Sequence, residues 1–112
     1  HNQYIKRKME EDMKITKTLN GNHLCFALEG RLDTNTAPEL ETAMKGAIDG
    51  VGELTIDMSS LDYLSSAGLR VLLGAQKIMN KQGSMRVTHV NDTIMEIFEV
   101  TGFSDILTIE KA

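Results

Sequence analysis

Short stretches in which apolar and polar residues alternate recur along the chain, as expected for β-strands with one buried face. Asn20-Gly21 lies between the first two stretches and is typical of a tight hairpin turn, because both residues tolerate positive φ. The predicted strands cover residues 15–19, 23–29, 54–58, 84–90 and 106–109.

The first segment with helical spacing contains Leu40, Ala43, Met44 and Ala47. Thr34 or Asn35 is expected to cap this helix, and Pro38 fits its first turn, where a missing N–H costs nothing. Glycines at positions 50 and 52 are expected to end it.

Two further helices are predicted in the second half of the chain. One runs from Ser66 to about Gln82 and stops at Gly83. The other follows a cap at Asn91 or Asp92 and ends at Gly102.

The order of these elements predicts an α/β fold with a mixed sheet of four to five strands and an opening β-hairpin. Strands that alternate with helices imply crossovers and parallel pairing. Because the strands alternate in polarity, three or more helices are expected mainly on one face of the sheet. The chain of 112 residues fits one domain, over 12–112, after a loose tail or expression remnant at 1–11.

Composition narrows the possible functions. The formal charge of −4 argues against nucleic acid as the main partner, because phosphate binding needs clustered Lys and Arg. No apolar run approaches the length of a membrane helix, so no direct membrane insertion is expected. One cysteine, Cys25, allows no internal disulfide and suits a reducing compartment, so we expect a cytoplasmic protein.

No pattern of catalytic residues, metal ligands or phosphate-binding glycines emerges, so neither an enzyme nor a cofactor is predicted. Cys25 is read as a small core or sheet-face residue, and His89 as a partly buried strand residue. Asp57 and Asp62 flank the exit of a strand and can in principle share acid–base work or Mg²⁺. We favour a structural role for these two carboxylates over a catalytic or metal-binding one.

Ser65 and Ser66 lie between a predicted strand and the second helix. Either hydroxyl can cap the helix, and on spacing alone this reading is favoured. A serine beyond the carboxyl end of a strand is also exposed where open α/β sheets place ligand contacts. Phosphorylation there adds about −1.5 to −2 charges, which a helix N-terminus tolerates and a closely packed partner does not.

Residues 61–73, LDYLSSAGLRVLL, strongly resemble the signature of STAS domains, in particular of bacterial anti-sigma factor antagonists. The segments LEGRLD at 28–33, GSMRV at 83–87 and VTGF at 100–103 are similar to further family segments. The resemblance covers roughly residues 13–110 and implies a single STAS-like domain.

The resemblance implies a binding protein that associates with a cytoplasmic anti-sigma factor, itself a serine/threonine kinase. Phosphorylation would end binding and a phosphatase would reset the cycle. Gly68 aligns the phosphoacceptor with Ser66, while Ser65 occupies a place where many members have Asp and is the second choice. The alternative is an unphosphorylated STAS subunit of a lipid-transport or other complex. The expected partner-binding residues are Asp33, Thr34, Asp62, Tyr63, Ser65, Ser66, Ala67, Gly68 and Arg70.

Overall fold

A computed structural model describes residues 13–112, so the predicted tail at 1–11 lies outside the described residues. The elements are β1 (Met13–Asn20), β2 (His23–Leu32), α2 (Ala37–Lys45), β3 (Glu53–Leu64), α3 (Ser66–Gln82), β4 (Ser84–Val90), α4 (Asp92–Thr101), η1 (Phe103–Asp105) and β5 (Ile109–Lys111).

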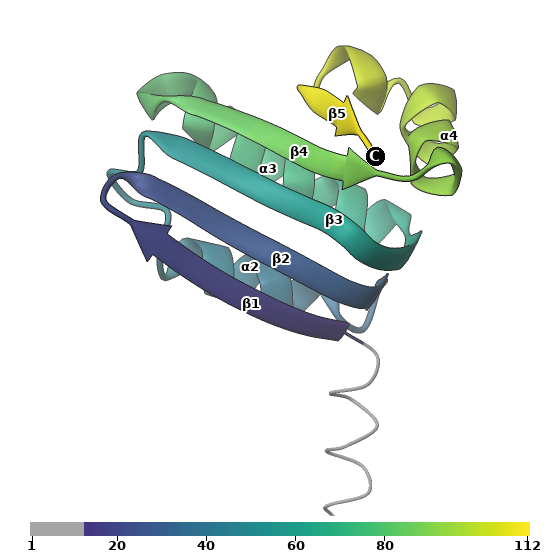
Figure 1. Ribbon diagram of the computed structural model, residues 1–112, viewed down its shortest axis with the longest axis horizontal. Helices are drawn as coiled ribbons and strands as arrows, with labels where there is room; N and C mark the ends of the chain where they lie inside the picture. Colours follow the sequence, from purple (N-terminus) through teal and green to yellow (C-terminus); the bar gives the residue numbers. More distant parts are fainter. Residues whose placement is uncertain (1–12) are drawn as a thin grey trace, which may run out of the picture.

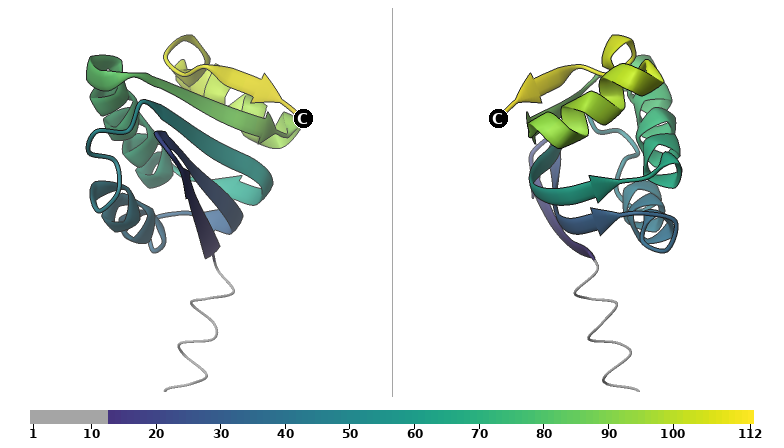
Figure 2. Two further views of the ribbon diagram at one scale, coloured as in Figure 1. Left: turned by 60° about the vertical axis from the view of Figure 1, so that its left-hand side comes forward. Right: turned by 90° about the vertical axis from the view of Figure 1, so that its right-hand side faces the viewer.

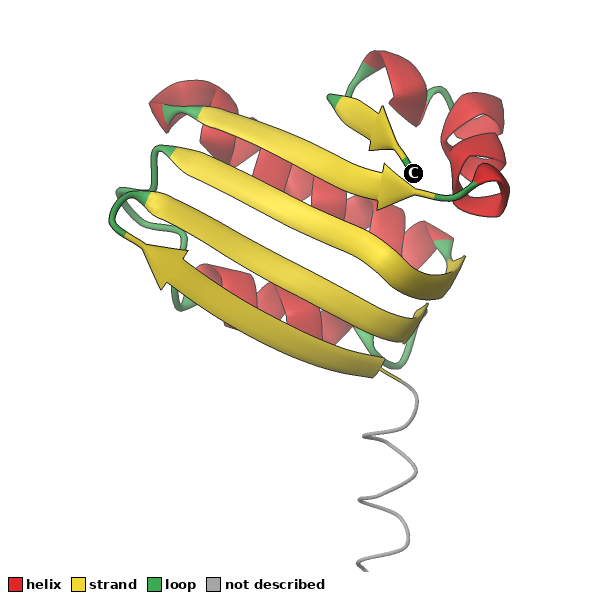
Figure 3. Ribbon diagram, viewed as in Figure 1, coloured by secondary structure: helices red, strands yellow, loops and turns green. Residues whose placement is uncertain are grey.

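The five strands form one sheet in the order β1-β2-β3-β4-β5, with β1 antiparallel to β2 and the other neighbours parallel (Figure 1). Helices α2 and α3 lie side by side over one face of this sheet (Figures 1 and 3). Helix α4 lies beyond the end of β4, at the edge of the sheet, apart from α2 (Figure 2). The predicted α/β class, mixed sheet and opening hairpin are confirmed.

The core lies between the sheet and the helices. Leu24, Phe26 and Leu28 of β2 are at most 1% exposed and point toward α2 and α3. Full burial of such a side chain contributes about 1.5–3 kcal/mol. Cys25 and Thr55 pair across β2 and β3 on the opposite sheet face, which no helix of the described residues covers. The alternation of apolar and polar residues along the strands therefore reflects a sheet that is covered by helices on one face only.

The hairpin turn lies one residue later than Asn20-Gly21 predicts. Asn20 pairs with His23, so the turn consists of Gly21 and Asn22. Gly21 has φ of 61°, a conformation that glycine adopts without a steric penalty.

Strand β3 is much longer than the predicted 54–58. Two irregularities in its pairing with β2 each insert one extra β3 residue, at Ser59 and near Asp62. The Asp57 carboxylate accepts a hydrogen bond from the Ser59 backbone N–H at 2.9 Å and fixes the first bulge. Each bulge breaks the two-residue period, which is why the pattern reveals only the first half of the strand.

Helix termini show both confirmed and corrected predictions. Helix α3 spans the predicted residues, and Asn91 caps α4 by accepting a hydrogen bond from Ile94 N–H at 2.9 Å. Gly102 ends α4 with φ of 80°. In contrast, α2 has Thr36 as its N-cap instead of Thr34 or Asn35, and it already ends before Gly46.

Strands β4 and β5 correct two details. His89 is not partly buried: its side chain is 60% exposed and its φ is 57°, which turns the backbone out of the strand alternation. The last strand is Ile109–Lys111 instead of 106–109, because η1 and a turn occupy the preceding residues.

Candidate functional site

The carboxyl ends of β2 and β3 and the starts of α2 and α3 meet at one end of the domain. Leu32 pairs with Leu64 in the parallel sheet. The backbone N–H of Ser65 donates to the Leu32 carbonyl oxygen at 2.9 Å. The structure therefore brings the loop after β2, which contains Asp33 and Thr34, next to the serine segment.

Ser65 is the N-cap of α3. Its backbone is extended, with φ −98° and ψ 174°, and its Oγ accepts a hydrogen bond from Gly68 N–H at 3.4 Å. Its carbonyl oxygen accepts from Leu69 N–H at 3.0 Å. The Ser65 side chain thus satisfies one of the free N–H groups at the start of the helix, as capping predicts, and its carbonyl oxygen accepts the first intrahelical bond.

Ser66 is the first residue of α3 and is exposed. None of the side-chain hydrogen bonds formed within residues 13–112 uses its hydroxyl. The two candidate hydroxyls are therefore distinct: one caps the helix and the other faces outward.

Gly68 is buried against the core. A Cβ at this position would lie 2.7 Å from Leu32 Cγ and 2.8 Å from Leu64 Cδ1. Gly68 therefore lets α3 approach the ends of β2 and β3. Its place among the expected partner-binding residues stays a prediction.

Asp33 organises the loop between β2 and α2. Its Oδ1 accepts hydrogen bonds from Asn35 N–H at 2.9 Å and Thr36 N–H at 3.1 Å. Burial alone would raise the pKa of the Asp33 carboxyl. The hydrogen bonds from Thr36 and Asn35, together with the Arg31 charge, outweigh burial and lower this pKa.

Tyr63 and Asp62 are exposed near the end of β3. The Arg31 guanidinium carbon lies 4.3 Å from the centroid of the Tyr63 ring, and Arg31 Nε lies 3.6 Å from Asp33 Oδ2. Arg31 thus links Tyr63 on β3 to Asp33 after β2. Sequence reasoning missed this residue, because only the parallel pairing of Arg31 with Tyr63 brings the two side chains together.

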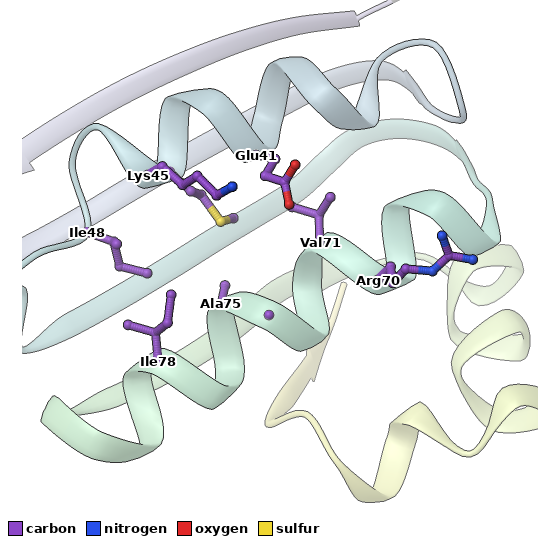
Figure 4. A pocket seen from close by; sticks show the side chains of 9 residues that line it. Glu41, Lys45, Ile48, Arg70, Val71, Ala75 and Ile78 are labelled. Atoms are coloured by element: carbon purple, nitrogen blue, oxygen red, sulfur yellow. The ribbon is translucent and has the colours of Figure 1, made fainter.

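Two hollows lie between α2 and α3. The first, of about 230 Å³, adjoins the serine segment and is lined by Thr34, Ala37, Pro38, Glu41, Ala67, Arg70 and Val71. The second, of about 90 Å³, continues along the helices past Glu41, Arg70 and Val71 to Ile78 (Figure 4). Thr34, Ala67 and Arg70 were expected at the site, whereas Pro38, Glu41 and Val71 follow only from how the helices pack.

The other candidate chemistry does not assemble. Asp57 contacts His89 Nδ1 at 3.2 Å on the sheet, whereas Asp62 is exposed further along β3, and the two carboxylates share no hydrogen bond. Within residues 13–112, no three His, Cys, Asp or Glu side chains form a group suited to a metal ion. No helix in this range is long and apolar enough to cross a membrane.

Comparisons with known proteins agree with this architecture. The family model of the STAS domain matches residues 14–112. A Bordetella bronchiseptica protein provisionally named anti-sigma factor antagonist BtrV is 33% identical over 102 residues, which cover 89% of this chain and 88% of that protein. The anti-sigma-B factor antagonist of Listeria monocytogenes is 31% identical over 98 residues, covering 85% of each.

Solved structures share the fold. An anti-sigma factor antagonist from Mycobacterium paratuberculosis superposes with a TM-score of 0.82 at 21% identity, over 91% of this chain and 88% of that one. Unphosphorylated SpoIIAA, also an anti-sigma factor antagonist, gives 0.75 at 16% identity, over 86% and 87% of the two chains. The chain therefore belongs to the STAS domain family and, within it, groups with the bacterial anti-sigma factor antagonists.

Proposed function

We propose that this domain is a cytoplasmic anti-sigma factor antagonist whose binding is ended by phosphorylation of Ser66. Its partner is an anti-sigma factor with serine/threonine kinase activity, and a phosphatase restores the bare hydroxyl. The observation that carries the choice of residue is the exposed Ser66 hydroxyl, which has no part in capping α3, next to the capping hydroxyl of Ser65.

The modification is a phosphoryl transfer from ATP. The Ser66 oxygen forms a bond to the γ-phosphorus, the bond from that phosphorus to the bridging oxygen breaks, and ADP leaves with the electron pair. The hydroxyl proton passes to a base of the kinase. Hydrolysis of the phosphate ester by the phosphatase returns the serine and releases inorganic phosphate.

The start of α3 tolerates the added charge in the free domain. The first turn contains no acidic residue, and helix N-termini favour negative charge by about 0.3–1 kcal/mol. A partner that covers Ser66 must instead desolvate a dianion, which costs several kcal/mol. A change of 1.4 kcal/mol in binding free energy changes the affinity tenfold. The desolvation cost is therefore large enough to release the partner.

The proposed docking surface surrounds Ser66. It comprises Asp33, Thr34, Asp62, Tyr63, Ser65, Ser66, Ala67 and Arg70, all partly or fully exposed. Residues at the rim of an interface steer and orient a partner, whereas the central ones decide affinity. We place Ser66 at the centre, between the loop after β2 and the end of β3.

The test uses the purified protein, the anti-sigma factor encoded in the same genome, and ATP. Labelling is mapped by mass spectrometry in the wild type, Ser66→Ala and Ser65→Asn; the Asn variant keeps a capping side chain while removing the second hydroxyl. We expect label in the wild type and in Ser65→Asn, and none in Ser66→Ala. Label on neither serine overturns the proposal.

A separate outcome would favour the alternative, an unphosphorylated STAS subunit of a lipid-transport complex. In that case the wild type and Ser66→Asp would bind the same transporter components with equal affinity. Neighbouring genes offer a quick first check, since they encode either a kinase-like anti-sigma factor or transporter subunits.

A further inference from the structure

Arg70 lies one helical turn after Ser66, on the same side of α3. Residues four apart on a helix are neighbours on its surface, and side chains lean toward the N-terminus. Both residues are exposed. Figure 4 shows the Arg70 side chain extending toward the end where α3 begins and away from Glu41 on α2. The guanidinium is therefore directed toward the region occupied by Ser66.

Among residues 13–112, Arg70 is also a cation at this end of the domain that forms no ion pair. Arg31 is engaged by the Asp33 carboxylate at 3.6 Å and by the Tyr63 ring at 4.3 Å. The ion pairs found within residues 13–112 involve Arg31, Arg86 and His89, and none involves Arg70. A new negative charge on Ser66 would thus meet a cation that need not abandon another partner.

We propose that Arg70 is the internal counter-ion of phosphorylated Ser66. This inference rests on the proposed function and identifies the side chain that stabilises the phosphorylated state. The planar guanidinium donates two N–H groups in a geometry that suits phosphoryl oxygens, and such charge-assisted bonds are stronger than neutral ones.

The pairing has a consequence for release of the partner. In the unmodified protein Arg70 lines both hollows between α2 and α3, next to Glu41 and Val71. Because its guanidinium already extends toward the start of α3, pairing with the phosphate would hold it there without a change of direction. One modification then changes two features of the docking surface: it adds charge at Ser66 and engages the Arg70 N–H donors that a partner could otherwise use.

The test uses phosphoserine incorporated at position 66 by genetic encoding, so that it requires no kinase. The second pKa of the phosphoserine is measured by ³¹P NMR titration in otherwise wild-type protein, in Arg70→Gln, in Arg70→Lys and in Lys77→Gln. Lys77 is an exposed cation further along the same helix and is the matched control. Circular dichroism verifies that each variant is folded.

A counter-ion favours the dianion, so Arg70→Gln is expected to raise this pKa by about 0.3 or more. Arg70→Lys should retain part of the effect, and Lys77→Gln should match the wild type. Equal pKa values in the wild type and Arg70→Gln overturn the inference even if a kinase labels Ser66. Failure of every kinase to label Ser66 would instead overturn the proposed function, while this titration would still report the contact.

Discussion

At the scale of single residues, Ser65 and Ser66 carry the same hydroxyl in different surroundings. The Ser65 hydroxyl accepts a hydrogen bond from Gly68 N–H, whereas the Ser66 hydroxyl is exposed. Substitutions at the two positions therefore have different consequences: loss of a cap costs about 1 kcal/mol of stability, whereas an exposed first-turn residue has little effect on folding.

The first prediction concerns Ser66→Asp. Its free energy of unfolding should remain within about 0.5 kcal/mol of the wild type, because carboxylates are favoured in the first turn of a helix. Its affinity for the anti-sigma factor should fall by more than about tenfold, since an interface would bury the charge. Urea denaturation and calorimetric titration measure the two quantities. Thr18→Asp adds the same charge on exposed β1 and should bind like the wild type.

Two glycines of α3 give a matched pair. Gly68→Ala forces a methyl group within 3 Å of Leu32 and Leu64 and is expected to destabilise the fold by about 1–3 kcal/mol. At Gly74 no atom lies within 4 Å of an added Cβ, so Gly74→Ala should stabilise the helix by up to about 1 kcal/mol. Urea denaturation of both variants measures the difference, and equal effects would contradict the packing assigned to Gly68.

At the scale of elements, side chains shape the segments that join strands to helices. Asp33 bonds to the N–H groups of Asn35 and Thr36, and the Ala37 N–H donates to the Asp33 carbonyl oxygen at 2.8 Å. Thr36, the N-cap by its backbone, makes no side-chain cap of its own. One carboxylate thus fixes the loop that leads from β2 into α2.

The lowered pKa of Asp33 predicts a pH-dependent stability. A carboxyl whose pKa is lower in the folded state stabilises the protein above its unfolded pKa, near 3.9, and this stabilisation is lost as the pH falls through the folded value. Asp33→Asn retains the shape and one acceptor oxygen but removes the charge. The wild type should therefore exceed Asp33→Asn in unfolding free energy at pH 5–7, and the difference should shrink below about pH 4.

Denaturant titrations across this pH range measure that difference. Asp49→Asn, at an exposed carboxylate in the loop after α2, is the control and should differ little from the wild type at any pH. A gap between the wild type and Asp33→Asn that stays constant down to pH 2 would contradict a contribution from the charge.

At the scale of the whole molecule, backbone segments far apart in sequence meet at the other end of the sheet. The Ser84 N–H donates to the Gly52 carbonyl oxygen at 3.0 Å where α3 passes into β4. A Cβ on Gly83 would overlap that same carbonyl group. Gly83 was predicted only as the end of a helix, but its φ of 178° is open to any residue, and the steric requirement comes from Gly52.

Gly83→Ala is therefore expected to destabilise the protein by about 3 kcal/mol, since backbone cannot move aside as easily as a side chain. Gly46→Ala, at the end of α2, would make only ordinary contacts of 3.6 Å or more and should be close to neutral. Thermal and urea unfolding compare the two variants. A neutral Gly83→Ala would show that the start of β4 can separate from Gly52.

Local patterns in the sequence determine much of this protein. The serine segment precedes a helix over Ser66–Gln82 because its apolar residues recur at helical spacing, and Asn91 caps α4 as its position suggests. The hairpin, the α/β order and the STAS signature are likewise readable, because each depends on residues adjacent in the chain. The location of Ser66 at a helix start follows from the same local signals.

Only the tertiary structure decides how far β3 extends through its bulges. The choice of Ser65 as the cap of α3, and of Asp33 as the support for the start of α2, is made within three residues, but the pattern left several neighbouring candidates open. The tertiary structure alone brings Arg31 next to Tyr63 and Gly68 next to Leu32. It also places Glu41 and Arg70 together in the lining of the hollow between α2 and α3. The physical reason is that periodicity and capping act within a few residues. Steric fit, strand register and the pairing of charges depend instead on segments that meet only when the sheet and helices have assembled.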